Sequence, residues 1–263
     1  MRVGFIGLGN VGGKLASSLL RDGFELMVND LQRAAAGPLL EDGAKWGENG
    51  AEVARYSDVV ITCLPSPQAS AEALEGEGGV LTGLSAGKIW LEMSSSDHQE
   101  VLRLGERVTA LGADALDSPV SGGCHRAATG NIAIFTGGAR AAFERALPVL
   151  TTIGRKVLHT GPLGSASILK VATNYLAGVH LIATGEALMV AKKAGIDLGV
   201  AYEAIRISSG NSFTHETEGQ LILNGSYAAD FTMDLELKDL SLFQSLAEQH
   251  QIPLELSPLA VDI

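Results

Sequence analysis

The feature that most constrains this chain is a glycine-rich turn directly after an apolar segment at its N-terminus. Residues Arg2–Ile6 are typical of a buried strand, and Gly7-Leu8-Gly9-Asn10-Val11-Gly12 leads from it into a segment with helical periodicity. In such a strand–turn–helix unit, the first glycine of the G-x-G-x-x-G pattern permits a tight turn. The second lets the backbone approach a pyrophosphate, and the third lets the helix pack against the strand. The motif therefore predicts a dinucleotide-binding βαβ unit, with the phosphates at the N-terminus of the helix.

A carboxylate after the second apolar segment supports this prediction. The segment Glu25–Asn29 is followed by Asp30, eighteen residues after Gly12, where an acidic side chain accepts hydrogen bonds from the adenosine ribose. Asp30 would also repel a 2′-phosphate, whereas Arg33 could bind one or could be a solvated helix residue. We therefore expect NAD as the cofactor, with NADP possible. A glycine turn and a turn aspartate that bind no ligand are the alternative interpretation.

The order of apolar and helical segments predicts an α/β fold followed by helices. Up to about residue 160, short apolar segments alternate with helical ones, which favours parallel βαβ units in a doubly wound, Rossmann-like sheet. Ser165–Lys193 then contains no proline and has apolar residues at helical spacing, and only helices are expected after it. We predict a Rossmann domain over residues 1–163 and a smaller all-helical substrate and oligomerisation domain over residues 164–263, joined through this one long helix. The predicted strands are Arg2–Ile6, Glu25–Asn29, Asp58–Leu64, Lys88–Met93, Ala113–Ser118, Asn131–Thr136 and Lys156–His159.

Composition excludes several classes of partner. The 263 residues carry a formal net charge of −11 without any Lys/Arg-rich run, which argues against nucleic acid or an anionic membrane as the main partner. Cys63 and Cys124 lack metal-ligand spacing and are expected to be free thiols in a reducing compartment, and no metal site is predicted. Because the chain begins directly with a strand and shows no apolar run of ~20 residues, we expect a cytoplasmic protein. A small anionic substrate is compatible with this composition.

Four segments carry a resemblance that covers nearly the whole chain. They are Gly4–Gly12, Asp117–Gly123, Gly161–Asn174 and the segment from Phe231 to Leu240. In this order they resemble the β-hydroxyacid dehydrogenase family, which includes 3-hydroxyisobutyrate dehydrogenases and tartronate semialdehyde reductases. The resemblance implies reversible hydride transfer between a nicotinamide cofactor and a small β-hydroxy acid or its semialdehyde. Members of the family usually continue beyond the position of Ile263, so we expect a short or incomplete helical domain.

Lys170 and Asn174 are the candidate catalytic pair. They are one turn apart on the predicted long helix and so lie on the same face, and that helix carries almost no other charge across its middle. A lysine in such a buried setting loses part of its affinity for the proton. It can then act as general acid to a carbonyl or as general base to a hydroxyl, while Asn174 orients the substrate or holds the lysine. The alternative is a lysine that extends to the domain edge beside a capping asparagine.

Ser121, Gly122 and Gly123 are the candidate substrate-binding residues. They follow a predicted strand, where backbone N–H groups without bulky side chains can form a concavity for an anion. The resemblance implies that the substrate carboxylate binds there, and a glycine-rich turn without a ligand is the alternative. The next residues depart from the family pattern, because Cys124, His125 and Arg126 stand where many relatives have small residues. His125 or Arg126 could bind a second acidic group, or could face solvent.

The resemblance also implies four further contacts with the cofactor. Leu64 and Pro65 would lie along the dinucleotide, Ser95 near the nicotinamide ribose, and Lys238 would reach toward the cofactor. Each of these residues could instead be structural.

Three other positions bear on the comparison with the family. Glu92 stands where relatives often have aspartate, and Ala166 replaces the second glycine of a G-x-G pattern. His215, with Glu216, could line a substrate cleft or form a solvated surface pair.

Two rival functions remain open. An imine reductase shares the architecture, but Lys170 argues against it because those relatives typically lack this lysine. A non-catalytic dinucleotide-binding module is the second rival, and the retention of Lys170, Asn174 and the Ser-Gly-Gly segment weighs against it. By analogy with the family, and from the apolar long helix, we expect a homodimer or homotetramer.

Overall fold

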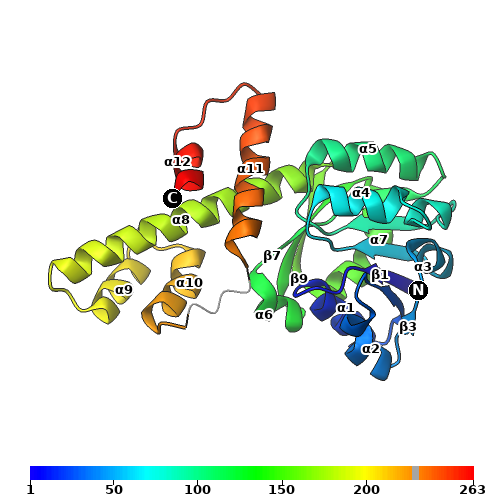
Figure 1. Ribbon diagram of the computed structural model, residues 1–263, viewed down its shortest axis with the longest axis horizontal. Coiled ribbons are helices and arrows are strands. Elements are labelled where there is room, and N and C mark those ends of the chain that lie inside the picture. The colour runs from blue at the N-terminus through cyan, green and yellow to red at the C-terminus, as the bar shows by residue number, and fades with distance from the viewer. Residues whose placement is uncertain (227–230) are drawn as a thin grey trace. The chain divides into compact units, whose positions relative to one another are not determined.

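The computed structural model describes residues 1–226 and 231–263, and the chain forms two compact units, Met1–Lys170 and Val171–Ile263. Strands and helices alternate through the first unit, and helices alone follow in the described part of the second (Figure 1). The predicted fold class is therefore confirmed: a Rossmann-like α/β sheet precedes an all-α domain, and one long helix links them. The sequence placed the domain boundary after residue 163, at the start of that helix.

Unit 1 is built on one sheet. In the described residues nine strands lie in the order β3-β2-β1-β4-β5-β6-β8-β7, with β9 paired to β8. The strands are β1 (Arg2–Ile6), β2 (Glu25–Asn29), β3 (Lys45–Trp46), β4 (Val59–Thr62), β5 (Ile89–Glu92), β6 (Asp114–Asp117), β7 (Val120–Ser121), β8 (Ile132–Gly138) and β9 (Gly154–Gly161). The first six strands are parallel. Their order is that of dinucleotide-binding sheets, in which ligands bind at the carboxyl ends of the strands where the order reverses, here between β1 and β4.

The β8 edge of the sheet departs from the predicted parallel arrangement. β8 runs antiparallel to β6 and β7, because the connection from β6 contains only β7 and the six-residue helix α6 (Gly123–Ala128). Six helical residues rise only about 9 Å, which is too short to return the chain to the start of β6. The chain therefore turns back beside β6, and β9 then pairs parallel with β8.

Helices cover both faces of the sheet and enclose two hydrophobic cores. The helices are α1 (Gly12–Arg21), α2 (Gly37–Glu41), α3 (Gly50–Tyr56), α4 (Pro67–Glu75), α5 (His98–Thr109) and α7 (Arg140–Ile153), with single turns at η1 (Arg33–Ala36) and η2 (Val80–Thr82). One core lies under α1, α2 and α7 and the other under α3, α4 and α5. Val59 and Ile61 of β4 belong to the first core and Val60 to the second. A strand covered on both faces does not alternate between apolar and polar residues, and β4 has three consecutive apolar residues before Thr62.

Unit 2 contains the second part of α8 (Ser165–Lys193) with α9 (Leu198–Arg206), α10 (Phe213–Leu223), α11 (Met233–Gln249) and α12 (Leu256–Asp262). Tyr175 of α8 stacks on Phe243 of α11 with ring centroids 4.3 Å apart. Tyr202 of α9 stacks on His215 of α10 at 4.5 Å. His215 is fully buried, and its Nε2 lies 3.0 Å from the Tyr202 carbonyl oxygen. The expectation of a solvated pair with Glu216 was therefore wrong for His215, because the stacked ring is covered by α9.

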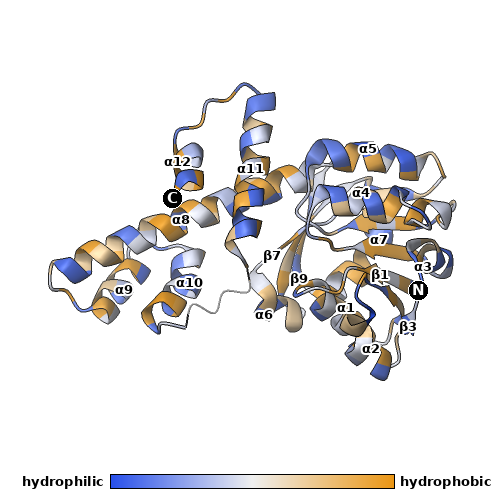
Figure 2. Ribbon diagram, viewed as in Figure 1, coloured by the Kyte–Doolittle hydropathy of each residue, from blue (hydrophilic) through white to orange (hydrophobic). Residues whose placement is uncertain are grey.

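The helix α8 is unusually long and apolar. By length and composition alone its 29 residues could cross a membrane, which the sequence analysis did not anticipate, although the core helix of a globular protein passes the same test. Figure 2 shows apolar residues along much of α8. Leu176, Met189 and Val190 are among its exposed side chains.

Candidate active site

The glycine-rich turn lies at the carboxyl end of β1, beside the end of β2. The Gly7 amide donates to the Asn29 carbonyl oxygen at 3.0 Å, and the Leu8 amide donates to Asp30 Oδ2 at 2.7 Å. The other oxygen of Asp30, Oδ1, accepts from the Gln32 amide at 2.8 Å. Asp30 therefore holds the turn in place while its carboxylate stays half-buried at the sheet edge.

The three glycines of the motif meet different surroundings. A Cβ on Gly7 would lie 2.3 Å from the Cys63 carbonyl oxygen, and one on Gly12 would lie 2.0 Å from the Gly7 carbonyl oxygen. Gly7 also has a φ of +95°, which side chains rarely allow. A Cβ on Gly9, by contrast, would meet nothing within 4 Å. The backbone is therefore packed tightly at Gly7 and Gly12 but is open at Gly9, which fits the approach of a bound pyrophosphate to Gly9.

A buried polar network joins the loops that follow β4 and β5. Glu92, at the end of β5, accepts from the Ser94 amide at 2.8 Å and from Thr62 Oγ1 at 3.1 Å. Thr62 Oγ1 in turn accepts from Trp90 Nε1 at 2.9 Å, and Ser94 Oγ accepts from the Leu64 amide at 2.8 Å. Burial raises the pKa of the Glu92 carboxyl. The network fixes the Leu64-Pro65 segment that was predicted to lie along the dinucleotide.

Sequence reasoning assigned no role to four residues of this network, Thr62, Trp90, Glu92 and Ser94. The sequence pointed to Ser95, which is half-buried beside them. The run Ser94-Ser95-Ser96 was visible, but which hydroxyl faces the neighbouring loop depends on the point at which β5 ends. Burial raises the pKa of the adjacent Cys63 thiol to about 12, which disfavours the thiolate form.

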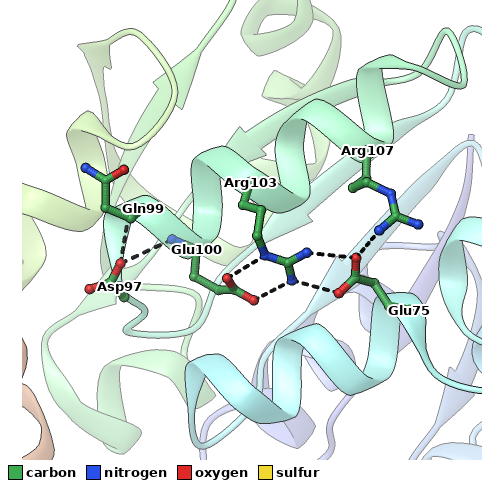
Figure 3. A network of polar contacts seen from close by, with 6 residues as sticks. All are labelled: Glu75, Asp97, Gln99, Glu100, Arg103 and Arg107. Atoms are coloured by element: carbon green, nitrogen blue, oxygen red, sulfur yellow. Dashed lines mark hydrogen bonds and ion pairs between the residues drawn. The ribbon is translucent and has the colours of Figure 1, made fainter.

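An ion-pair network joins the two helices that follow these loops (Figure 3). Arg103 of α5 contacts Glu75 of α4 through Nη1–Oε1 and Nη2–Oε2 hydrogen bonds of 2.9 and 2.7 Å. Arg103 also contacts Glu100 within α5, and Arg107 pairs with Glu75 as well. The hydrogen bond from Arg103 holds the pKa of the Glu75 carboxyl below its usual value. Because these groups are partly solvated, each pair contributes modestly, but together they connect α4 to α5.

The predicted substrate-binding segment begins four residues after Asp117, the last residue of β6. Ser121 lies in β7, opposite Ala133 of β8. Gly122 and Gly123 have φ angles of +130° and +79°, so only glycine adopts this backbone without strain. The segment thus presents a turn without side chains at the carboxyl edge of the sheet.

The two basic residues after this segment lie against it. The Arg126 Cδ is 3.0 Å from the position of a Cβ on Gly122, and His125 Nδ1 is 3.6 Å from that of Gly123. Arg126 is half-buried and His125 is exposed. Both side chains therefore lie near the segment, and His125 faces solvent. Binding of a second acidic group by either residue stays a prediction.

Lys170 and Asn174 lie one turn apart on α8, as predicted. Lys170 is 7% exposed and is the last residue of unit 1. In unit 2, Asn174 Nδ2 donates to Asp239 Oδ2, and Lys238 Nζ donates to Asp239 Oδ1 at 2.5 Å. Asp239 is buried and so joins Lys238 to Asn174. In the sequence analysis Asp239 lies within the family-like segment from Phe231 to Leu240 and has no role of its own, because only the fold shows that it has two hydrogen-bond partners.

Comparison with known proteins matches these features to one family. Residues 2–161 match the NAD-binding domain of 6-phosphogluconate dehydrogenase, and residues 164–263 match the family described as NAD-binding of NADP-dependent 3-hydroxyisobutyrate dehydrogenase. The chain belongs to the β-hydroxyacid dehydrogenase family and is similar to its 3-hydroxyisobutyrate dehydrogenases. The predicted family is thereby confirmed, and with it an NAD(P)-dependent oxidoreductase that acts on the CH–OH group of a hydroxy acid.

Individual relatives cover nearly the whole of this β-hydroxyacid dehydrogenase. The 2-(hydroxymethyl)glutarate dehydrogenase of Eubacterium barkeri is 34% identical, over 100% of this chain and 88% of its own length. The 3-hydroxyisobutyrate dehydrogenase of Pseudomonas aeruginosa is 32% identical, over 98% of this chain and 89% of its own. The crystal structure of a 3-hydroxyisobutyrate dehydrogenase from Salmonella typhimurium has a TM-score of 0.89 at 31% identity, covering 100% of this chain and 92% of that one.

Substitutions of Gly9 and Gly12 distinguish an effect on cofactor affinity from an effect on the stability of the fold. In Gly9→Ala, the added Cβ meets no protein atom. We therefore expect an unchanged free energy of unfolding, within about 0.5 kcal/mol, and a Kd for NADH raised by about tenfold or more, equivalent to about 1.4 kcal/mol. In Gly12→Ala the Cβ meets the Gly7 backbone, so we expect loss of about 1–3 kcal/mol of stability as well.

Urea unfolding and titration of NADH fluorescence measure the two quantities. Gly185→Ala, in α8, is the matched control, because its Cβ also meets nothing within 4 Å and the glycine lies outside the motif. Gly9→Ala binding NADH as tightly as the wild type would contradict the assignment of this turn.

Proposed function

We propose that this enzyme interconverts a small β-hydroxy acid and its semialdehyde, with Lys170 as the general acid and base. The observation that carries the proposal is the pair Lys170 and Asn174 on one face of α8 in a member of this family. The names of the relatives, which include 2-(hydroxymethyl)glutarate and 3-hydroxyisobutyrate dehydrogenases, support the substrate class.

Each residue of the proposed site has its own role in the reaction. When bound, the nicotinamide supplies or accepts the hydride. In reduction the Lys170 ammonium donates a proton to the carbonyl oxygen, and in oxidation the neutral amine accepts the proton of the hydroxyl. Asn174, whose amide is held by Asp239, orients the substrate oxygen or the lysine. The backbone of Ser121, Gly122 and Gly123 binds the substrate carboxylate and so fixes which carbon meets the cofactor.

We also propose a preference for NAD over NADP. Asp30 carries a negative charge where a 2′-phosphate would bind. Arg33, the nearest candidate cation by sequence, lies 3.4 Å from Glu48 and its guanidinium carbon is 5.1 Å from the centre of the Trp46 ring. Glu48 therefore offsets part of the charge of Arg33, and the Trp46 ring lies against the flat face of its guanidinium group. A cytoplasmic setting is proposed as well, and the free thiols of the chain are compatible with it.

Removal of Lys170 tests the proposed chemistry. For Lys170→Ala we expect kcat to fall by roughly 100- to 10,000-fold, the usual contribution of a general acid or base, with the Kd for NADH little changed. NADH absorbance with a panel of β-hydroxy acids, each with NAD and with NADP, measures activity and cofactor preference together. Lys192→Ala, an exposed lysine on the same helix, is the control and should retain wild-type kcat.

The same assay separates the rival functions. A wild-type enzyme that reduces a cyclic imine faster than any semialdehyde would indicate an imine reductase. A chain that binds NADH but turns over nothing in the panel would indicate a non-catalytic module. Equal activity of Lys170→Ala and wild type would remove the proposed role of the lysine.

We propose that Arg126 binds a second carboxylate of the substrate. Its side chain lies against Gly122 and so places a positive charge beside the substrate-binding turn, in a chain whose net charge is −11. The E. barkeri relative is named for a dicarboxylic substrate. For Arg126→Gln we expect kcat/KM for 2-(hydroxymethyl)glutarate to fall by about 10- to 100-fold, as for loss of a charge-assisted hydrogen bond.

Activity with 3-hydroxyisobutyrate, which has one carboxylate, should stay within about threefold in that variant, less than 1.4 kcal/mol. His125→Gln is the matched control on the neighbouring residue. An equal fall for both substrates in Arg126→Gln would mean that Arg126 supports the turn rather than the second carboxylate.

We propose a homodimer or homotetramer assembled through unit 2. Unit 2 has many large exposed apolar side chains, and neither hydrophobic core of unit 1 includes them. They are Leu176, Leu181, Met189, Val190, Ile196, Val200, Ile207, Phe213, Phe231, Met233, Leu237, Ile252, Leu256, Leu259 and Ile263. Burial of such side chains against a second copy of the chain would remove apolar surface from water, which favours association.

Light scattering after gel filtration measures the assembly. We expect a mass of two or four chains for the wild type and a smaller one for the double variant Met189→Asp/Val190→Asp, because charges there oppose burial. Leu111→Asp, an exposed leucine of unit 1, should leave the mass unchanged. A monomeric wild type would refute the proposal.

A further inference from the structure

A buried carboxylate at the end of β6 caps the long helix. Asp117 Oδ1 accepts from the Gly164 amide at 2.9 Å, and Oδ2 accepts from the Ser167 amide at 2.7 Å and from Ser167 Oγ at 2.9 Å. Gly164, which directly precedes α8, has no side chain that could cap the helix itself. Asp117 therefore provides, from 47 residues earlier in the chain, the acceptors and the negative charge that favour a helix N-terminus.

The surroundings of Asp117 allow little displacement. Its side chain is fully buried, and a Cβ on Gly137 of β8 would lie 2.4 Å from Asp117 Oδ1 and 2.7 Å from both the Pro162 carbonyl oxygen and Ser165 Oγ. Ser165 Oγ is itself 2.7 Å from Thr160 Oγ1. The end of β6, β8 and the first turn of α8 thus meet without intervening side chains. A buried acid is costly unless it is fully hydrogen-bonded, and burial raises the pKa of Asp117 while its three hydrogen bonds oppose that rise.

The same carboxylate lies between the two parts of the proposed catalytic machinery. On one side, Ser167 is three residues before Lys170, so the two are neighbours on adjacent turns of α8. On the other side, the chain runs from Asp117 directly into the substrate-binding segment at Ser121. We propose that Asp117 is a positioning residue, which fixes Lys170 relative to the segment that binds the substrate carboxylate. This inference rests on the proposed role of Lys170.

Asp117→Asn tests this inference. The amide keeps the shape of the side chain but replaces one acceptor oxygen with an NH2 donor. That NH2 group then faces a backbone N–H or the Ser167 hydroxyl and cannot accept a hydrogen bond from it. We expect kcat to fall by about 10- to 100-fold, the scale of a misplacement of about 1 Å. The Kd for NADH should stay within about threefold, under 1.4 kcal/mol, because the proposed cofactor cradle lies on other strands. Hydrogen exchange in the peptide covering the first turn of α8 should be faster than in the wild type.

Two further variants separate positioning from general stability. Asp114→Asn changes the carboxylate at the other end of β6, where it pairs with Arg145 at 2.6 Å, and should leave kcat unchanged whatever it does to the melting temperature. Ser167→Ala removes the hydroxyl hydrogen bond alone and leaves both amide contacts. It should fold and lower kcat by about two- to tenfold, less than Asp117→Asn, because the two amide hydrogen bonds still hold the start of α8.

These experiments distinguish failure of the inference about Asp117 from failure of the proposed function. If Asp117→Asn and Ser167→Ala melt at lower temperature but have wild-type kcat per folded molecule, Asp117 is only a structural cap and the inference is overturned. If Asp117→Asn does not fold, a wild-type kcat in Ser167→Ala is by itself sufficient to overturn the inference about Asp117. If the wild type has no hydroxy-acid activity, or Lys170→Ala equals it, the proposed function itself fails.

Discussion

The contact of Gly12 with the carbonyl oxygen of Gly7 governs the arrangement of unit 1. With no side chain between them, α1 begins directly on the end of β1, and the intervening turn remains open at Gly9. β1 is the strand at which the sheet order reverses, flanked by β2 and β4. The loops that follow those two strands consequently converge on the same turn. One close backbone approach therefore determines both how the first helix packs and where a dinucleotide can bind.

The sequence predicted most of the sheet because its signals are local. The bounds of β1 and β2 were predicted to the residue, since each is a short apolar run ended by turn chemistry. The two-residue strands β3 and β7 and the short helices α3 and α6 were not identified, because segments of two to seven residues carry little periodicity. The antiparallel direction of β8 depends on the shortness of α6, which no residue signals by itself. The residue-level site assignments stay predictions.

What the sequence could not show is which polar groups meet across the fold. Glu92 and Asp117 end neighbouring strands, β5 and β6, and both are buried. Glu92 accepts from the amide of Ser94 and from the hydroxyl of Thr62 in β4, whereas Asp117 accepts from backbone amides at the start of α8. Glu92 connects the loops after β4 and β5, whereas Asp117 connects β6 to α8. Their partners in the chain lie up to 50 residues away, so composition and spacing give no indication of the pairing. At this edge of the sheet, buried carboxylates hold loops and helix ends in fixed positions, as disulfides or metals do in smaller proteins.

The hydrogen bonds of Asp30 have a consequence for how the adenosine end of a cofactor would be recognised. An ionised carboxylate offers about four lone-pair directions, and the amides of Leu8 and Gln32 occupy one on each oxygen. One acceptor direction per oxygen is left, which matches the two hydroxyls of an unmodified ribose. The side chain is already oriented by the backbone, so little conformational entropy would be lost on binding. A ribose phosphorylated at one hydroxyl presents one donor fewer to the same pair of oxygens, and discrimination would then come from an unmatched acceptor as well as from charge.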